Sequence, residues 1–493
     1  MNRAPTSWSE MVSRRALLAW GGTGVVAVVV AACSSAAPSP TSAPPTPASQ
    51  TNAPVPTQAP AAPTSVPAAA PAATAAPTTA PQAVSQPASG SSVSLTFFYP
   101  VGVAGPLSKL IDDMTAKFNA TQNGAIKVTP VYSGDYLQSL SKAQTAIQGG
   151  KPPDVAVLNA AAIFTLQDMG AVIPLDSMAK ATDPQIADDF FPAFLQDSKL
   201  NGTLIGLPFQ RSTLVFYYNP DLLKMAGLGD KPPQTWDDVV SFGQKLIQKN
   251  GDAVTRWGVS FPSSGSSYWE FQALAIEAGQ NVMGDVGNKV FFNSDASVTA
   301  LQWVIDLAQK YKIMANGTLD WGNLPTDFAG GKSAMIWHST GSLSFIASQA
   351  KFTVGVAFDP KNKQFGSPTG GGNMYIFKGI PQANQDAAWK FVTAMCAPES
   401  LAQWSINTGY VAPRKSCYDV QAYKDYTTKF PQALVARDQL QYAQRELGTH
   451  QMAQVQTILS NAIQAALTGK QSPKAALDDA QKQADQLLSS FNN

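Results

Sequence analysis

Short polar segments follow several predicted strands, and their side chains are the first candidates for chemistry. They are residues 134–136, 159–160, 211–212, 339–341, 370–373 and 408–410. Ligands of open α/β sheets bind at the carboxyl ends of strands, so hydroxyl, amide and backbone N–H groups placed there can hold a polar molecule. Ser339-Thr340-Gly341 also precedes a predicted helix, whose unpaired N–H groups favour a polar or anionic ligand. Ordinary helix capping explains the same three residues.

Aromatic side chains lie near the same segments. A flat ring can stack on a sugar ring, and the polar edge of Trp or Tyr can hydrogen-bond to its hydroxyl groups. Core packing explains any one of these aromatics equally well, and only their convergence from distant segments would favour a binding site. The aromatics concerned are Tyr136, Trp257, Tyr268, Trp269, Trp321, Trp337 and Tyr410.

Signatures of enzymes and of cofactor sites are missing from the chain. The only histidines are His338 and His450, so a histidine-based metal cluster is not expected. No nucleophile elbow or phosphate-binding P-loop occurs. We therefore predict no catalytic residue, no metal site and no cofactor. A glycosidase with two facing carboxylates remains the alternative, and its candidate residues are Glu270, Glu277 and Asp327.

The elements that must position these residues follow from hydrophobic periodicity. Alternation of strands and helices predicts an α/β fold with a mostly parallel sheet. Thr235 is an expected N-cap for a helix that begins at Trp236. The predicted strands are 93–99, 125–132, 154–158, 203–207, 214–218, 256–261 and 334–338. The predicted helices include 107–118, 136–148, 300–311 and several long helices after residue 385.

The first 90 residues have the composition of an export leader and a spacer. Residues 1–32 combine Arg14-Arg15 with an apolar run, which predicts a signal peptide of the twin-arginine kind. Val30-Ala31-Ala32-Cys33 is similar to a lipobox, so lipidation of Cys33 is expected; an uncleaved anchor helix is the alternative. Residues 33–90 are rich in Pro, Ala, Thr and Ser and are expected to form a disordered tether.

Charge and cysteine content limit the remaining possibilities. A net charge of +1 gives no attraction to nucleic acid, so no nucleic-acid partner is expected. Cys396 and Cys417 could pair in an oxidising compartment, or each could be a small buried apolar residue.

Three motifs of the body resemble those of family 1 extracellular solute-binding proteins. They are residues 207–213 (LPFQRST), residues 217–236 (YYNPDLLKMAGLGDKPPQTW) and residues 404–414 (WSINTGYVAPR). The resemblance covers residues 93–490. It implies a type II periplasmic-binding-protein-like fold, in which two α/β lobes joined by a hinge close on a ligand in the interlobe cleft. The implied body spans residues 91–493. Lobe 1 is expected at about 93–205 and 335–385, and lobe 2 at about 213–332 and 390–490.

The order of motifs is most similar to that of glycerol-3-phosphate-binding proteins, which implies ligand contacts at five positions. They are Tyr136, Ser212, Thr340, Gly371 and Tyr410. Two positions depart from that group. Its hydroxyl-binding glutamate falls near Ala160, and its phosphate-binding arginine falls near Gln454, which weakens the case for a phosphate ligand.

We therefore predict an ABC-importer solute-binding lipoprotein that captures a sugar or oligosaccharide by hinge closure and delivers it to permease subunits. The alternative ligands are sn-glycerol 3-phosphate and a glycerophosphodiester, and a sensor or adhesin without a transporter is a further alternative. The body is expected to be monomeric and lipid-anchored to the outer face of the cytoplasmic membrane. The predicted ligand-binding residues are Tyr136, Asn159, Arg211, Ser212, Trp269, Trp337, Ser339, Thr340, Gly371, Gly372 and Tyr410.

Overall fold

Three parallel strands form one end of the sheet in the computed structural model. They are β1 (Val93–Tyr99), β2 (Ile126–Tyr132) and β3 (Val155–Asn159), in the order β3-β1-β2. Helices α1 (Leu107–Thr121) and α2 (Tyr136–Gln148) connect them, and both bury an apolar face. The predicted boundaries of these five elements agree with the structure to within a few residues, because their hydrophobic periodicity is strong.

The structure describes residues 92–492, which belong to one unit of the chain. The predicted leader at 1–32, Cys33 and the spacer at 33–90 lie outside the described residues. Within 92–492, no helix has the length and apolar character needed to span a membrane.

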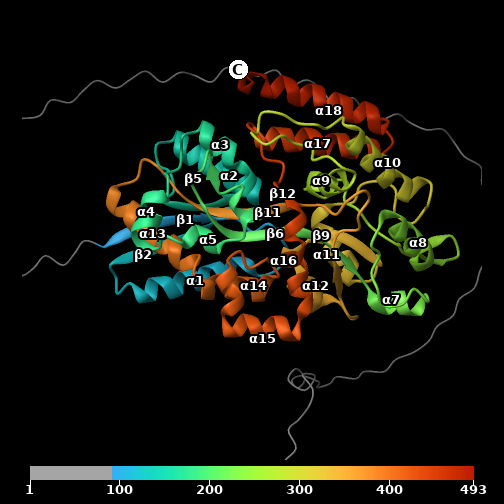
Figure 1. Ribbon diagram of the computed structural model, residues 1–493, viewed down its shortest axis with the longest axis horizontal. Coiled ribbons are helices and arrows are strands. Elements are labelled where there is room, and N and C mark those ends of the chain that lie inside the picture. Colours follow the sequence, from blue (N-terminus) through green and yellow to red (C-terminus); the bar gives the residue numbers. More distant parts are fainter. Residues whose placement is uncertain (1–91, 493) are drawn as a thin grey trace, which may run out of the picture. The chain divides into compact units, whose positions relative to one another are not determined.

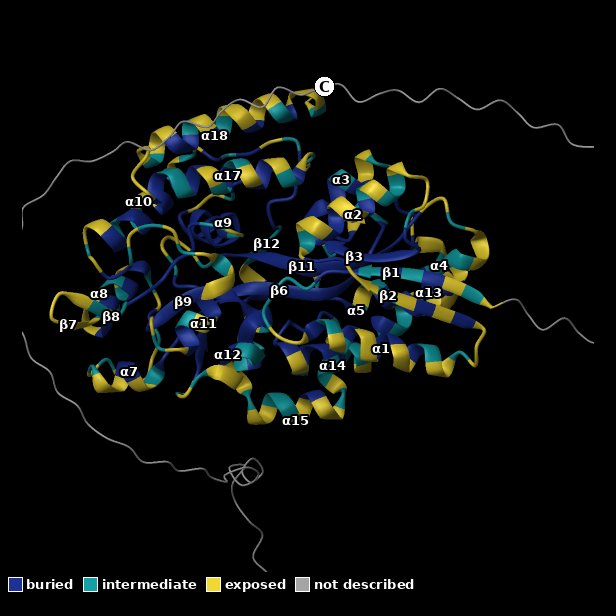
Figure 2. Ribbon diagram, turned by 180° about the vertical axis from the view of Figure 1, so that it is seen from behind, coloured by how far each residue is buried: buried dark blue, intermediate teal, exposed yellow. Residues whose placement is uncertain are grey.

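Two long antiparallel strands extend the sheet through the centre of the described body. β6 (Leu207–Tyr218) and β11 (Ser367–Ile376) are buried along their whole length, and Figure 2 shows them in dark blue. β9 (Met335–Ser339) and β10 (Gly355–Ala357) pair with β6, and β12 (Ala443–Gln444) pairs with β11. The sheet is therefore mixed. The expectation of a mostly parallel sheet holds for β1, β2 and β3 and for the pairing of β12 with β11, and it is wrong for β6, β9, β10 and β11, whose other pairings are antiparallel.

The motif around Pro208 is part of a strand, although residues 208–213 fall between the predicted strands 203–207 and 214–218. β6 runs without interruption from Leu207. A register shift of β11 between Gly372 and Asn373 accommodates Pro208, which has no N–H to donate. The predicted strand at 256–261 is also wrong: β8 ends at Arg256, and the residues beyond it make isolated bridges.

The first lobe packs its helices on β1, β3 and β11 around a core that includes Phe97, Phe391 and Trp404. Figure 1 shows α1, α2 and α13 around this end of the sheet. Besides α1 and α2, its elements are α3 (Ile163–Asp168), α4 (Asp176–Thr182), α5 (Ile186–Asp189), α6 (Pro192–Leu195), β4 (Lys199–Leu200), β5 (Thr203–Leu204), α13 (Gln382–Met395), α14 (Pro398–Thr408) and α15 (Gln421–Lys429).

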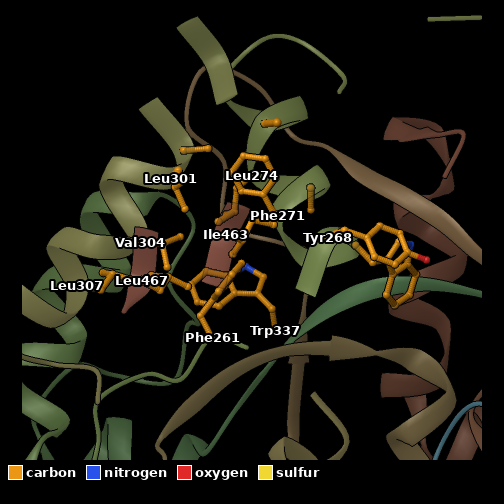
Figure 3. Packing of buried hydrophobic residues seen from close by; sticks show 14 of the residues in the cluster. Phe261, Tyr268, Phe271, Leu274, Leu301, Val304, Leu307, Trp337, Ile463 and Leu467 are labelled. Atoms are coloured by element: carbon orange, nitrogen blue, oxygen red, sulfur yellow. The ribbon is translucent and has the colours of Figure 1, made fainter. Parts of the chain in front are cut away.

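The second lobe is built around a cluster that includes Trp337, Phe261 and Phe271, with α17 and α18 packed side by side over α9 and α10 (Figures 1 and 3). Its elements, besides β9, β10 and the end of β6, are α7 (Pro220–Met225), α8 (Trp236–Leu246), β7 (Gln248–Asn250), β8 (Ala253–Arg256), α9 (Ser267–Glu277), α10 (Asp295–Gln309), α11 (Leu324–Ala329), α12 (Leu343–Gln349), α16 (Val435–Gln439), α17 (Met452–Leu467) and α18 (Pro473–Leu488).

Two segments pack in the lobe opposite to the one expected. β9 pairs with the end of β6, so residues 335–357 join the second lobe. Residues 390–430 join the first lobe, where the Phe391 ring centroid lies 5.0 Å from that of Phe97. Periodicity shows that such a helix has an apolar face, but it does not show which end of a continuous sheet that face covers.

Cys396 and Cys417 are both buried and unbonded in the first-lobe core. Burial raises the pKa of the Cys417 thiol to about 12, so it remains protonated. Both residues therefore pack as small apolar side chains.

Candidate ligand-binding site

A cavity of about 60 Å³ opens between the two lobes. It adjoins an outer cleft of about 620 Å³, which α17 borders through residues 456–464. Elements of both lobes line the cavity, which is the arrangement expected of a site that closes around a ligand. Seven of the predicted residues lie in its wall: Tyr136, Asn159, Ser212, Trp269, Ser339, Gly371 and Tyr410.

Tyr136 is the first residue of helix α2, and the N-cap Asp135 fixes the start of this helix so that Tyr136 faces the cavity. Asp135 accepts a hydrogen bond from the Gln138 N–H and completes a capping box. The Tyr136 hydroxyl donates to Gln210 Oε1 on β6 at 2.9 Å. The ring packs against Gly102, where an added Cβ would lie 2.6 Å from it. The ring is thus held between its own helix, a loop and the central strand.

At the cavity wall, two glycines allow β11 to approach the backbone of β6 and the ring of Trp269 closely. Gly371 has φ +90°, and a Cβ there would lie 1.7 Å from the Gln210 carbonyl oxygen. At Gly370, a Cβ would lie 2.4 Å from the ring of Trp269, whose Nε1 donates to the Thr369 carbonyl at 3.1 Å. Only glycine allows this close approach of strand and ring. Packing therefore explains why this segment is rich in glycine, and a phosphate-binding loop is not needed to explain it.

Trp321 lines both the cavity and the outer cleft, as do Tyr136 and Tyr268. One face of its ring stacks on His338, with centroids 4.1 Å apart, and its Nε1 donates to Glu270. His338 Nε2 lies 3.1 Å from the Trp321 carbonyl oxygen, which can only accept, and burial lowers the pKa of His338 to about 4. His338 is therefore neutral, and Trp321 is a rigid platform whose partly exposed side faces the cleft.

Glu446 is the only ionisable carboxylate among the described residues that line the cavity. Its Oε1 accepts from the Tyr268 hydroxyl at 2.7 Å and from Asn159 Nδ2 at 3.2 Å. Its Oε2 is buried and has no hydrogen-bond partner within residues 92–492. Burial raises the pKa of Glu446 to about 7, although the hydrogen bonds from Tyr268 and Asn159 act in the opposite direction.

Arg211 and Trp337 do not line the cavity: strand alternation turns Arg211 away from it, and Trp337, on the same face of β9 as Ser339, packs in the core of the second lobe. Arg211 precedes Ser212 on β6 and faces the opposite side, where Nη1 donates to Asn373 Oδ1 at 2.9 Å and the guanidinium lies over Phe194. Trp337 is fully buried in the second lobe.

Thr340 and Gly372 are the other two predicted residues outside the cavity wall. Thr340 lies buried in the turn after β9, where the Ser339 hydroxyl accepts from the Gly341 N–H at 3.1 Å. Gly372 follows Gly371 on β11 and faces β3, since a Cβ there would lie 2.7 Å from Val157.

The carboxylates of the glycosidase alternative do not face one another across the cavity. Glu270 accepts from Trp321, and Glu277 Oε2 accepts from Trp236 Nε1 at 2.7 Å. Asp327 pairs with Lys332 at 2.7 Å near the surface. Within residues 92–492, no cluster of three or more His, Cys, Asp or Glu residues is arranged to hold a metal ion.

Seven residues of the cavity wall are absent from the predicted ligand-binding set: Gly102, Val103, Ser266, Tyr268, Trp321, Gly370 and Glu446. Tyr268 and Trp321 carry the aromatic signal described above, but nothing in the sequence distinguishes them from core aromatics. Glu446 carries no local signal, since it lies between an Arg and a Leu far from the other wall residues. The resemblance leaves no carboxylate near Ala160, and the fold places Glu446 beside Asn159 instead.

A two-lobed α/β body with a polar and aromatic cavity between the lobes defines the class of type II solute-binding proteins. The family model of the bacterial extracellular solute-binding proteins matches residues 113–431, more than half of the chain. The chain belongs to this family. It is therefore a solute-binding protein of the kind that serves ABC importers, and it is not an enzyme.

Known proteins of this class show both sequence and fold similarity. The sn-glycerol-3-phosphate-binding periplasmic protein UgpB of Escherichia coli K12 is 29% identical over 405 residues, covering 78% of this chain and 91% of that protein. UgpB from Mycobacterium tuberculosis, solved with glycerophosphocholine, has a TM-score of 0.72 at 24% identity and covers 82% of this chain and 99% of that one. The cyclic alpha-maltosyl-1,6-maltose binding protein from Arthrobacter globiformis has a TM-score of 0.68 at 22% identity, covering 81% and 100%. At these identities, the two solved structures establish the fold alone.

Proposed function

We propose that the ligand is a neutral carbohydrate, a sugar or short oligosaccharide. The observation that carries this proposal is the chemistry of the cavity wall. It offers aromatic faces, hydroxyl groups, glycine backbone and one carboxylate, and none of its described residues is Lys, Arg or His. A sugar presents apolar ring faces for stacking and hydroxyl groups that donate and accept, so its surface is complementary to such a wall.

sn-Glycerol 3-phosphate or a glycerophosphodiester is the second candidate, because relatives that are 29% identical over 405 residues are named for glycerol 3-phosphate. Arg211 also supports it, since two of its guanidinium nitrogens have no partner among the described residues. The orientation of Arg211 toward Asn373 counts against it. A phosphate in the cavity would lack the bidentate cation that usually binds it.

Ligand capture would proceed by closure of the lobes, without covalent chemistry. The chain connects the lobes along β6, along the segment before β11 and along the segment between α15 and α16. Small changes in these connections would let the lobes rotate, and a ligand that contacts both walls would shift the population toward the closed form. The closed form would then deliver the ligand to the permease subunits of the importer.

We also propose that Cys33 carries the lipid that holds this protein at the outer face of the cytoplasmic membrane. The lipobox-like Val30-Ala31-Ala32-Cys33 supports this, and the Pro-rich residues 33–90 would let the body reach its membrane partner. The Cys33→Ser variant should lose palmitate label and leave the membrane fraction. Retention of both would contradict the lipid anchor. A single species of one chain's mass in solution would support the proposed monomer.

The ligand class is tested by thermal unfolding of the purified protein with a panel of neutral sugars, polyols and their phosphates. A ligand that binds only the native state raises the melting temperature, and the shift grows with ligand concentration. We expect the shift with a neutral sugar. A shift produced only by glycerol 3-phosphate or glycerophosphocholine would favour the second candidate.

A further inference from the structure

We propose that Glu446 is the specificity-determining residue of the cavity: its carboxylate binds adjacent hydroxyl groups of a neutral sugar and excludes phosphorylated ligands. This inference rests on the proposed carbohydrate ligand. Glu446 is only 3% exposed, and it belongs to the connection between β12 and α17. A carboxylate placed so deeply in a ligand cavity must be compensated by donors.

One oxygen of Glu446 is already occupied, and its donors come from both lobes. Tyr268 of α9 donates at 2.7 Å and Asn159 of β3 donates at 3.2 Å, both to Oε1. The Asn159 side chain is itself oriented, because its Oδ1 accepts from the Ala161 N–H at 2.7 Å. These contacts orient the carboxylate and leave Oε2 without a donor within the described residues.

The unpaired Oε2 of Glu446 requires a hydrogen-bond donor from the ligand. A buried acceptor without a donor costs free energy, and a ligand that supplies an O–H recovers it. Two neighbouring sugar hydroxyls can donate to one carboxylate, while the ring stacks on a wall aromatic such as Trp321. The proposed ligand therefore presents adjacent hydroxyl groups close to an apolar ring face.

The charge of the wall excludes phosphate. Glu446 lines the cavity without a cationic side chain beside it there, and Arg211 lies behind β6 with Nη1 bonded to Asn373. A phosphate would lose its hydration next to a like charge, with no cation in the wall to compensate. Repulsion of this kind is a direct means of rejecting a phosphorylated analogue of the ligand.

A quaternary ammonium ligand would also be attracted to a carboxylate among aromatic rings. Its quaternary nitrogen has no hydrogen to donate, however, and the single hydroxyl group of choline does not supply the adjacent donors that a sugar offers to Oε2 of Glu446. The open hydrogen-bonding position thus favours a hydroxylated ligand over a choline-like cation.

The test is calorimetric titration of the purified protein at pH 8, where Glu446 is ionised. The probes are neutral mono- and disaccharides, glucose 6-phosphate, glycerol 3-phosphate, choline and glycerophosphocholine. Glu446→Gln should weaken binding of the best neutral sugar at least about tenfold. It should also reduce the ratio of the affinity for this sugar to the affinity for the phosphorylated probes. Glu446→Asp should also weaken sugar binding but keep the exclusion of phosphate, because it keeps the charge.

Asp113→Asn is the matched control, since it removes the same charge from an exposed residue of α1 and should leave all affinities unchanged. Melting curves of each variant verify folding, and Glu446→Asp decides the question if the Gln variant does not fold. Unchanged sugar affinity in Glu446→Gln overturns the role of Glu446 and leaves the proposed function intact. Binding of phosphorylated probes but no neutral sugar by the unmodified protein overturns both. Choline binding that requires Glu446 overturns the neutral ligand in favour of a cation.

Discussion

At the scale of single residues, the cavity wall is held in place by contacts behind it. Trp321 is fixed by His338 and Glu270, and Tyr136 by Gln210. Side chains fixed in this way lose little conformational entropy when a ligand arrives, so more of the contact energy appears as affinity.

Removal of the Trp321 ring should weaken ligand binding with a modest effect on folding. We expect Trp321→Ala to lower the affinity for the best neutral sugar at least about tenfold, since an aromatic ring that a ligand covers is a typical hot spot. Titration calorimetry measures the change. Tyr442→Ala is the control, because Tyr442 is an exposed aromatic outside the cavity. Equal affinities of Trp321→Ala and the unmodified protein would rule out the stacking role.

Ligand affinity should also depend on pH through Glu446, whose pKa burial raises to about 7. A ligand that donates to the carboxylate prefers its ionised form. Affinity is therefore full above this pKa and is lost as the pH falls through about 7 toward 6. The other titratable groups that act on Glu446 are Asp197, Arg211, Tyr136, Tyr268 and Tyr410.

Calorimetry between pH 6 and pH 8 measures this dependence, with proton release detected in buffers of different ionisation enthalpy. Glu446→Gln should make the affinity independent of pH over this range. A pH profile that the substitution leaves unchanged would assign the titration to another group.

At the scale of elements, β6 and β11 serve both lobes at once. Their antiparallel pairing forms the buried centre of the sheet, and Ser212 and Gly371 are adjacent to the cavity where the strands lie between the lobes. A defect in this pair therefore affects folding and ligand binding together.

Gly371→Ala should destabilise the protein strongly. Its φ is +90°, and the new Cβ would lie 1.7 Å from the Gln210 carbonyl oxygen, so β6 and β11 would have to separate. Gly469→Ala is the matched control, because Gly469 also has positive φ (+73°) but has no neighbour within 4 Å. The control should lower the free energy of unfolding by ~1–2 kcal/mol. Gly371→Ala should lower it clearly more. Denaturant unfolding of both variants measures the difference, and equal losses would contradict the steric explanation.

At the scale of the whole described body, the lobes touch outside the cavity as well. His450 lies just before α17, and its Nδ1 is 2.8 Å from Oδ2 of Asp168 at the end of α3. The His450 ring stacks on Phe491, with ring centroids 4.2 Å apart. Phe164 of α3 lies on the other side, 5.3 Å from the His450 ring. We call these four residues the interlobe contact. It joins the first lobe to the C-terminal helices of the second.

Weakening the interlobe contact should favour an open form. We expect Asp168→Asn to increase the ligand-free radius of gyration in small-angle scattering and to lower ligand affinity about twofold to fivefold, as for the loss of a partly exposed polar contact. Asp478→Asn is the control, since Asp478 pairs with Lys474 within α18.

Saturating ligand should compact the unmodified protein. Absence of compaction would contradict closure of the lobes.

The sequence by itself determined the class and the local elements. The periodicity of α1 and α2 and the β-branched composition of β1 are local properties, so their boundaries were predicted closely. The motifs at 207–213, 217–236 and 404–414 indicated the family. The polar segments named from the sequence contribute seven of the fourteen residues of the cavity wall, although Ser212, Gly370 and Gly371 lie within β6 and β11 rather than at strand ends.

Only the tertiary structure decided which side each residue faces and which distant segments meet. Arg211 and Ser212 are neighbours in sequence, yet strand alternation sends the first into the core and the second into the cavity. Residues 390–430 joined the first lobe because Phe391 packs on Phe97. Glu446 reached Asn159 across 287 positions of the chain. Such contacts depend on how elements pack over long sequence separations, and local patterns contain no information on that packing.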